Sequence, residues 1–423
     1  MRFWRAHSRQ HLQGAFFALC LLLFAGAASA QTAALSNDSG IAAYNAGRFD
    51  EAIEHFQNAL QGASDSTVVQ RNLCNAYQAA ANELAKCGNY SKAVKLLESA
   101  LEADAANASP RVQIGSYLLR LRRVSEAIPQ LEKAIELKPG ELDAHELLGH
   151  GYYEDNDVPS ARAQWDYVLE MDPQRDHLRE QYEKAFREEA VEQNFNREGS
   201  RHFRISYPRG ITKDMRNRVL TILERARMDI GRNFGGVYPA EAIHVIIYSA
   251  AQFSEATQLD AHVGAVFDGK IRVPLTDEHG ETLSPEELKK RLTHEYVHVV
   301  VRQIAGNNVP WWLNEGLAET FSNDLDDRDT EVLQRAYAQQ LAFPLADLES
   351  SQLSKLTPDV LSLAYTQSHA TTELLWSRFG QARLTQLMKA LASGTPAEEA
   401  LRRTCRLTYA ALERDVADTY TVN

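Results

Sequence analysis

A period of 34 residues constrains the fold of the first half of the chain more than any other feature of the sequence. Alanine recurs at this interval, at Ala93, Ala127 and Ala161. Four positions after each alanine stands a large apolar residue: Leu97, Leu131 or Trp165. A repeat of this length is too small to bury a core alone, so neighbouring repeats must stack and share one. The period therefore predicts an all-α solenoid.

The single repeats resemble tetratricopeptide repeats. Each has a first helix, a short turn such as Gly88–Tyr90 and a second helix, with Pro139 and Pro173 at equivalent positions after the second helix. An earlier copy precedes the second by 41 residues, from Ala52 to Ala93, and we expect its seven extra residues to lengthen the helix around 68–84. The resemblance implies a groove that binds a peptide or a partner protein, with a rigid spacer as the alternative.

The repeats are expected to end with an amphipathic capping helix that carries Leu178, Tyr182 and Phe186. The polar segment 194–200 ends the helical pattern, and we place a domain boundary there. We predict a tetratricopeptide-repeat domain over residues 31–193 and a second domain over residues 200–423.

Residues 1–30 have the layout of a secretory signal peptide. Three arginines precede an apolar run over residues 15–25, and Ala28-Ser29-Ala30 follows it. The run is shorter than the roughly 20 residues that span a bilayer. We therefore expect cleavage after Ala30, export to the periplasm or the outside of the cell, and no membrane span in the mature chain.

The overall charge and the cysteines exclude other classes of protein. A net charge of -12 argues against a nucleic-acid partner, which needs a basic face, and favours a peptide or protein. After cleavage the chain keeps Cys74, Cys87 and Cys405, an odd number without a CxxC pair. We expect buried thiols rather than a disulfide framework, with a Cys74–Cys87 pair left open.

The second half changes to mixed α and β patterns. Residues 203–205 alternate, residues 213–233 follow a helical period, and residues 243–248 form an apolar run typical of a buried strand. Residues 263–274 read as strand, turn and strand. Ser284-Pro285-Glu286-Glu287 then combines a cap, a proline at the first helical position and a capping-box glutamate, which predicts a helix to about Ile304.

The helix that starts there contains His294, Glu295 and His298. Four residues make just over one helical turn, so both imidazoles project from one face toward one point. Two imidazoles at this spacing suit Zn²⁺, and Glu295 lies where a carboxylate can act on a water as the general base.

Catalytic zinc usually has three protein ligands, so a third is required. Glu315 and Glu319 lie one turn apart in the following helical segment, 311–319. One of these carboxylates can bind the metal while the other orients a histidine ligand.

The two segments together resemble the HExxH and NEG-x-A signatures of the gluzincin metallopeptidases, and in particular their peptidase MA-like domain. The resemblance implies a thermolysin-like α+β fold, Glu315 as the third zinc ligand and Glu319 as the carboxylate behind His294. Tyr365-Thr366-Gln367-Ser368, in a helix expected from Leu361 to Phe379, resembles the segment in which aminopeptidases of this clan carry an oxyanion-stabilising tyrosine. Packing between helices is the alternative for Tyr365, and His369 is the next candidate.

The sequence thus predicts an exported two-domain protein, a repeat solenoid followed by a zinc metallopeptidase that hydrolyses peptide bonds. Two alternatives stay open. One is a binding scaffold that keeps a non-catalytic peptidase fold, and the other is a zinc hydrolase that acts on a different carbonyl substrate.

Overall fold

A computed structural model describes residues 31–259, 265–277, 279–350 and 357–421, which divide between two compact units. The first unit comprises the chain up to Leu118 together with Gln130–Ala144, and the second comprises Leu119–Pro129 together with the chain from His145 onward. The predicted signal peptide lies outside the described residues. Within the described ranges, no helix is both long and apolar enough to cross a membrane.

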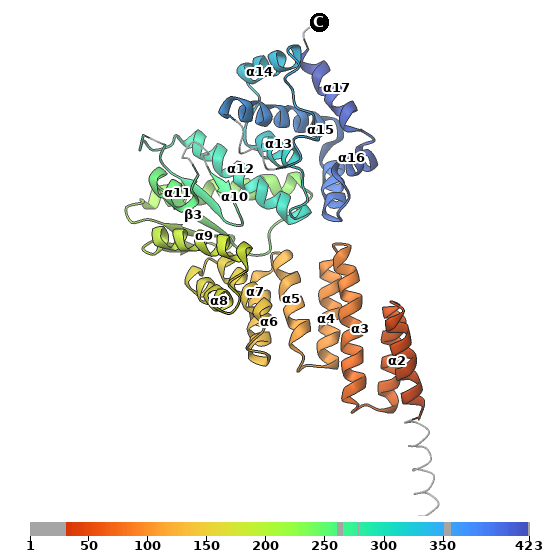
Figure 1. Cartoon of the computed structure of the whole chain (residues 1–423). Helices are drawn as coiled ribbons and strands as arrows, with labels where there is room; N and C mark the ends of the chain where they lie inside the picture. The colour runs from red at the N-terminus through yellow and green to blue at the C-terminus, as the bar shows by residue number, and fades with distance from the viewer. Residues whose placement is uncertain (1–30, 260–264, 278, 351–356, 422–423) are drawn as a thin grey trace, which may run out of the picture. The chain divides into compact units, whose positions relative to one another are not determined.

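The repeat region is entirely helical, as predicted (Figure 1). Residues 31–45 are helical and precede the labelled helices. These have the following bounds: α2 Phe49–Gly62, α3 Thr67–Lys86, α4 Tyr90–Ala103, α5 Ala108–Arg120, α6 Val124–Leu137, α7 Leu142–Glu154, α8 Val158–Met171 and α9 Asp176–Glu192. The 20 residues of α3 confirm the lengthened helix that the irregular spacing predicted.

Small residues let the helices of each repeat approach closely. Ala127 and Leu131 are both fully buried, as are the equivalent residues of the neighbouring repeats. A Cβ atom at Gly115 would lie only 2.5 Å from Leu131, so the large side chain occupies the space that the glycine leaves. The large residue of this repeat therefore fills space between α5 and α6. The three described thiols are free, but Cys87 is exposed at the end of α3, which corrects the expectation that all three are buried.

A five-stranded mixed sheet begins directly after the repeats. Its order is β1-β2-β3-β5-β4, with β2, β3 and β5 parallel and the two outer strands antiparallel to their neighbours. The bounds are β1 Asn196–Gly199, β2 Phe203–Tyr207, β3 Ile243–Tyr248, β4 Val266–Phe267 and β5 Ile271–Pro274. The polar segment that the sequence marks as a boundary thus supplies β1, an edge strand whose side chains are all exposed.

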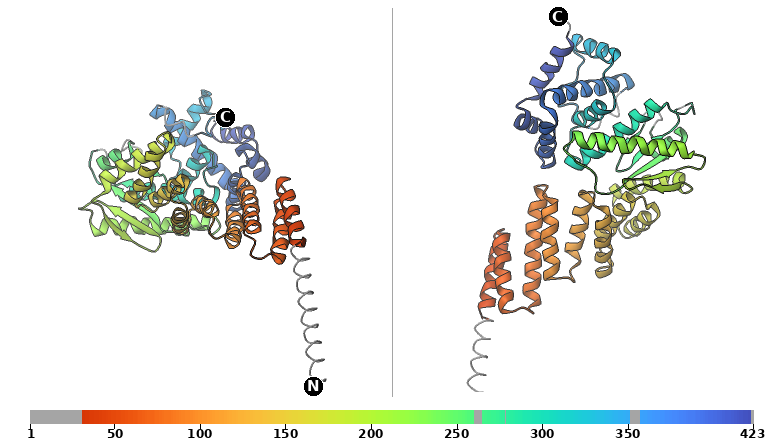
Figure 2. Two further views of the ribbon diagram at one scale, coloured as in Figure 1. Left: turned by 60° about the horizontal axis from the view of Figure 1, so that its bottom comes forward. Right: turned by 180° about the vertical axis from the view of Figure 1, so that it is seen from behind.

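Helices cover both faces of this sheet, because successive side chains of a strand point to opposite faces. Val245 and Ile247 of β3 belong to the core shared with α10 (Lys213–Asn233) and α12 (Pro285–Ala305). Ile246 and Tyr248 pack instead with α11 (Ala250–Thr257). Figure 2 shows this arrangement from two further directions.

The remaining helices extend the core of α12. Their bounds are α13 Trp311–Ser322, α14 Asp327–Ala338, α15 Pro358–Ala392, α16 Ala397–Cys405 and α17 Tyr409–Tyr420. The long α15 is kinked at Gly380, whose positive φ of 65° interrupts the helical backbone. Its first segment therefore ends at Phe379, as the sequence predicted.

The capping helix α9 differs from the expectation. Leu178 is fully buried as predicted, but Phe186 is 53% exposed and lies under the guanidinium of Arg162. The buried face of α9 contains Glu188 instead, and this carboxylate pairs with Arg272 of β5 at 2.9 Å. The buried face of α9 thus includes an acidic residue that the amphipathic pattern did not predict.

Arg272 ties α9 to the sheet through several carboxylates. Its fully buried guanidinium also contacts Glu192 at 3.0 Å and Asp268 at 3.3 Å. The hydroxyl groups of Tyr153 and Tyr248 accept further hydrogen bonds from it. A buried charge is tolerated only when it is paired and hydrogen-bonded in this way. The last helix of the repeats therefore forms one structural unit with the sheet.

We expect Glu188→Ala to destabilise the second unit by about 3 kcal/mol, because it leaves a buried arginine short of one partner. Glu198→Ala, which removes an exposed partner of Arg216, should cost less than about 1 kcal/mol. Chemical unfolding followed by tryptophan fluorescence measures both, since all four described tryptophans lie in the second unit. Equal losses in the two variants would contradict a structural role for the Glu188 pair.

Candidate metal centre

The helix α12 begins and ends where its sequence specifies. The Ser284 hydroxyl accepts a hydrogen bond from the backbone N–H of Glu287 at 3.1 Å, and Pro285 occupies the first helical position. Gly306 ends the helix with a φ of 63°. One side of α12 is buried against the sheet and α10, through residues such as Leu292, Tyr296 and Val300. The opposite side is left to line a cleft.

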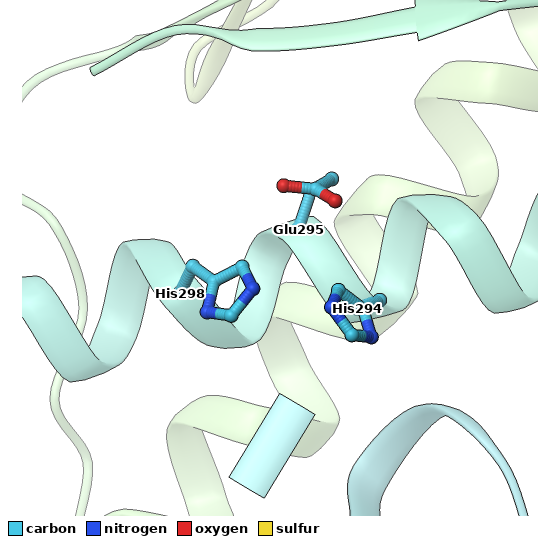
Figure 3. A group of neighbouring side chains, drawn as sticks. All are labelled: His294, Glu295 and His298. Atoms are coloured by element: carbon cyan, nitrogen blue, oxygen red, sulfur yellow. The ribbon is translucent and has the colours of Figure 1, made fainter. Parts of the chain in front are cut away.

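His294, Glu295 and His298 form a cluster on α12 that could hold a metal ion. Their potential ligand atoms all lie within 4.8 Å of one another. Figure 3 shows the two imidazoles on one side of the helix and Glu295 projecting from a different side between them. Glu295 is 4% exposed, whereas both histidines are half-buried and open to the cleft.

Backbone hydrogen bonds to residues 348–349 and a close approach to α15 fix the position of the neighbouring helix α13. The N–H groups of Trp311 and Trp312, at its start, donate to the carbonyl oxygens of Glu349 and Leu348. A Cβ atom at Gly316 would lie 2.3 Å from the carbonyl oxygen of Ser368 on α15, which no side chain could tolerate. The glycine of the Asn-Glu-Gly segment therefore permits a close crossing of α13 and α15.

This crossing places Glu315 opposite both histidines. Its Oε2 atom lies 3.4 Å from Nε2 of His294 and 3.5 Å from Nε2 of His298. Glu319, one turn later, faces the other ring nitrogen of His294, with Oε1 at 3.3 Å from Nδ1. The structure thus brings the predicted ligands together at one point and puts Glu319 behind His294.

Asn314 is a site residue that the sequence analysis quoted without giving it a role. The Nδ1–H of His298 donates to its amide oxygen at 3.1 Å, and its amide nitrogen lies 3.4 Å from Oε1 of Glu315. Such contacts fix the ring orientation of a metal-binding histidine and leave Nε2 free for the metal. The sequence signal for this role was the position of Asn314 directly before Glu315.

The charges of the cluster favour a bound cation. Burial alone would lower the pKa of His294, but hydrogen bonds to Glu315 and Glu319 raise it to about 10. Burial would likewise raise the pKa of Glu315, yet the positive charge of His298 and contacts with both rings hold it well below its usual range. Burial raises the pKa of Glu295. The carboxylates that favour the protonated imidazoles of His294 and His298 would likewise favour a bound cation.

The donor set fits a catalytic divalent metal. Two imidazole nitrogens and one carboxylate oxygen are the ligands that such zinc sites use, with a fourth position left for water or substrate. Oε2 of Glu295 is buried and has no hydrogen-bond partner among the described residues, as expected for a group whose partner binds with the metal. The site opens into a cleft of about 620 Å³, large enough for a segment of peptide.

Tyr365 lines the same cleft from α15, and its ring packs edge-on against Trp311 with centroids 5.0 Å apart. Burial and the carboxylates of Glu315 and Glu319 raise the pKa of its hydroxyl, so the group stays protonated and able to donate. His369 is buried on α15 and is not among the described residues that line the cleft. Of the two candidates, only Tyr365 faces the site.

The two halves of the chain match different protein families. Residues 234–420 match the Peptidase MA superfamily, and residues 79–141 and 112–176 match the tetratricopeptide repeat. The comparison with curated proteins gives no match.

Solved structures of repeat proteins resemble the N-terminal part. MamA is 20% identical over 37% of this chain and 81% of its own, with a TM-score of 0.31. YrrB, described as a tetratricopeptide-repeat protein with an unusual peptide-binding site, is 20% identical over 36% of this chain and 74% of its own, with a TM-score of 0.30. The first repeat domain of Spaghetti, bound to an HSP90 peptide, is 19% identical over 27% and 92%, with a TM-score of 0.26.

The second half of the chain thus combines an α+β fold with a His-Glu-His cluster on α12 that could hold a metal ion. Residues 234–420 are accordingly a Peptidase MA superfamily domain, and tetratricopeptide repeats precede it in the chain. The family resemblance inferred from the two motifs is confirmed. The limits of the two predicted domains, 31–193 and 200–423, stay predictions.

We expect the purified protein to bind about one divalent metal ion per chain, and Glu315→Ala or His298→Ala to abolish binding. Asn314→Ala should weaken metal affinity by about 10- to 100-fold, since it frees the ring of His298. Asn307→Ala, which changes an amide elsewhere in the cleft, is the matched control. Elemental analysis after dialysis against a chelator series measures all of these, and full metal content after loss of both histidines would disprove the site.

Proposed function

We infer that the protein is an exported zinc metallopeptidase, with His294, His298 and Glu315 as zinc ligands. The observation that carries this inference is the convergence of three metal-binding atoms on one point, next to a buried carboxylate oxygen of Glu295 that has no hydrogen-bond partner among the described residues. The Peptidase MA domain supports a peptide as the substrate class. The ligand set of two histidines and a glutamate supports zinc over metals that prefer oxygen alone.

The chain's own residues supply the remaining parts of peptide hydrolysis. Zinc bound at this site would polarise a water molecule and the substrate carbonyl. Glu295 accepts the proton of the attacking water and then donates it to the leaving amine. The Tyr365 hydroxyl donates a hydrogen bond to the carbonyl oxygen as negative charge develops on it. Glu319 and Asn314 keep the imidazoles in the orientation that the metal requires.

The repeats are proposed to bind the protein substrate or a partner protein. Stacked helical repeats present an extended surface for this purpose, and tetratricopeptide repeats are protein-binding modules. The layout of residues 1–30 supports export to the periplasm or the outside of the cell. Binding outside the metal centre would raise the local concentration of a substrate segment at the cleft.

Glu295→Gln should keep the bound metal and lower kcat for casein or a mixed peptide library by on the order of a thousandfold, because it removes the general base without removing a ligand. Glu286→Gln changes an exposed carboxylate in the first turn of the same helix and should leave kcat unaltered. Elemental analysis and peptide cleavage assays give the two readouts. Cleavage that persists in Glu295→Gln would refute this mechanism. If the metal-loaded native chain cleaves no peptide, the result would instead favour a binding scaffold or a hydrolase that acts on another carbonyl substrate.

Tyr365→Phe should lower kcat by on the order of a hundredfold with little change in metal content, as expected when one oxyanion donor is lost. Tyr337→Phe, which alters a half-buried tyrosine of α14 away from the cleft, serves as the control. Steady-state cleavage of one peptide by both variants makes the comparison. An unchanged rate would assign Tyr365 to packing on Trp311.

A further inference from the structure

The helix α12 carries a third long side chain on the face of its two histidines. Arg302 follows His298 by four residues, as His298 follows His294, so the three side chains stand in one row along the cleft. One such step advances about 6 Å along a helix axis. Arg302 thus lies one turn beyond the metal ligands, within the same cleft.

The charge of Arg302 has no partner of its own. It forms no ion pair with any residue in the described parts of the chain, and the carboxylates that raise its pKa are those of Glu154 and Asp268. Both are already paired, Glu154 with Arg122 and Asp268 with Arg272 and Lys184. Burial, and then the neighbouring Arg122, lower the pKa of Arg302. An anion bound beside Arg302 would favour its charged form and so oppose both effects.

The surroundings of Arg302 leave its donors accessible. Its guanidinium lies over the ring of Phe267 in β4, 5.7 Å from the ring centroid. A guanidinium stacked on an aromatic ring keeps its N–H groups free at its edge, where a carboxylate can accept two of them.

A glycine in the β4–β5 turn keeps the space beside this guanidinium open. A Cβ atom at Gly269, whose φ is +114°, would lie 3.8 Å from Arg302 Nη1 and 3.6 Å from Arg122 Nη2. A further cavity of about 170 Å³ lies here and is lined by both arginines. Together with Phe267, Arg302 lines this cavity and the main cleft.

We propose that Arg302 binds a carboxylate of the peptide substrate and thereby makes the enzyme selective for acidic substrates. This proposal rests on the proposed peptidase function. An extended peptide advances about 3.3 Å per residue, so a helical step of about 6 Å places the carboxylate about two residues from the scissile bond. The carboxylate is either an acidic side chain or the C-terminus of the peptide, and the experiment separates the two.

Lys290 provides a matched comparison at the other end of the row. It precedes His294 by four residues and also lines the cleft. Its charge is opposed by Glu319, whose pKa it helps to lower. Neither cation forms an ion pair among the described residues, and removing either one changes the charge of the cleft by one unit, so Lys290 controls for an effect of overall charge.

The direct test measures binding to the full metal-loaded chain carrying Glu295→Gln, which does not depend on turnover. The probes are fluorescent heptapeptides, blocked at both ends, in which one glutamate occupies each position in turn, and the same series with glutamine. Shorter peptides with a free or an amidated C-terminus form the second series. Fluorescence anisotropy gives the ratio of the dissociation constants within each pair.

We expect tighter binding of the carboxylate member by about tenfold or more at one position, as for a charge-assisted bidentate hydrogen bond. Adding Arg302→Met should reduce this ratio to near one, Arg302→Lys should keep part of it, and Lys290→Met should leave it within about twofold. Preference in the glutamate series assigns the site to an acidic side chain, and preference in the free C-terminal series assigns it to the terminal carboxylate.

Two results would overturn the proposal: equal binding of both members in every pair, or a preference that survives Arg302→Met. An equal loss in Lys290→Met and Arg302→Met would overturn it as well, because the effect would then come from the overall charge of the cleft. The parallel measurement of kcat/KM with the native chain tests peptidase function separately. If the native chain binds glutamate peptides through Arg302 and cleaves none, the proposed function fails and the binding site stands.

Discussion

The metal centre depends on the distance at which α13 crosses α15. Gly316 makes this crossing possible, since a Cβ atom there would lie 2.1 Å from the Thr372 hydroxyl as well as overlapping the backbone of α15. Any larger residue would push α13 outward and move Glu315 away from the histidines of α12. Metal sites tolerate errors of only about 0.2 Å in ligand position. The same crossing brings Tyr365 to the cleft, so one missing side chain determines the position of the ligand and of the proposed oxyanion donor.

Electrostatic potential varies along the face of α12 in a way that suits a charged peptide. The centre of the row collects carboxylates whose charge a divalent metal would offset, and the Glu319 carboxylate opposes the cation at the Lys290 end. At the far end Arg302 forms no ion pair among the described residues, and the carboxylates whose charges act on it, Glu154 and Asp268, are paired with other cations. A substrate with an anionic group on that side would match this pattern, because its charge would meet Arg302 and stay away from Glu315. Electrostatic complementarity of this kind directs orientation and selectivity more than it raises raw affinity.

Local signals predicted much of this structure, and non-local pairing explains what they missed. The limits of α10 and α12 follow from caps and periodicity, and the repeat period predicted buried pairs such as Ala127 and Leu131. The spacing within one helix was enough to place His294 beside His298. Glu188 was missed because a glutamate on a helix normally faces water, and its partner Arg272 lies in a strand far along the chain. Segment 196–199 forms a strand only because β2 lies beside it, which no pattern within those polar residues could indicate.

The ion pairs of Arg272 also limit the positions at which recombination could have replaced the repeats of this chain during evolution. Recombination at the polar segment 194–200 would bring a new repeat array and discard Glu188 and Glu192, so a buried guanidinium would keep Asp268 as its remaining carboxylate. Such a hybrid would begin with a destabilised sheet next to α12. A junction between repeats, ahead of His145, would replace part of the repeat array and keep these pairs intact. Shuffling should therefore favour junctions inside the solenoid, with its last helices inherited together with the Peptidase MA domain.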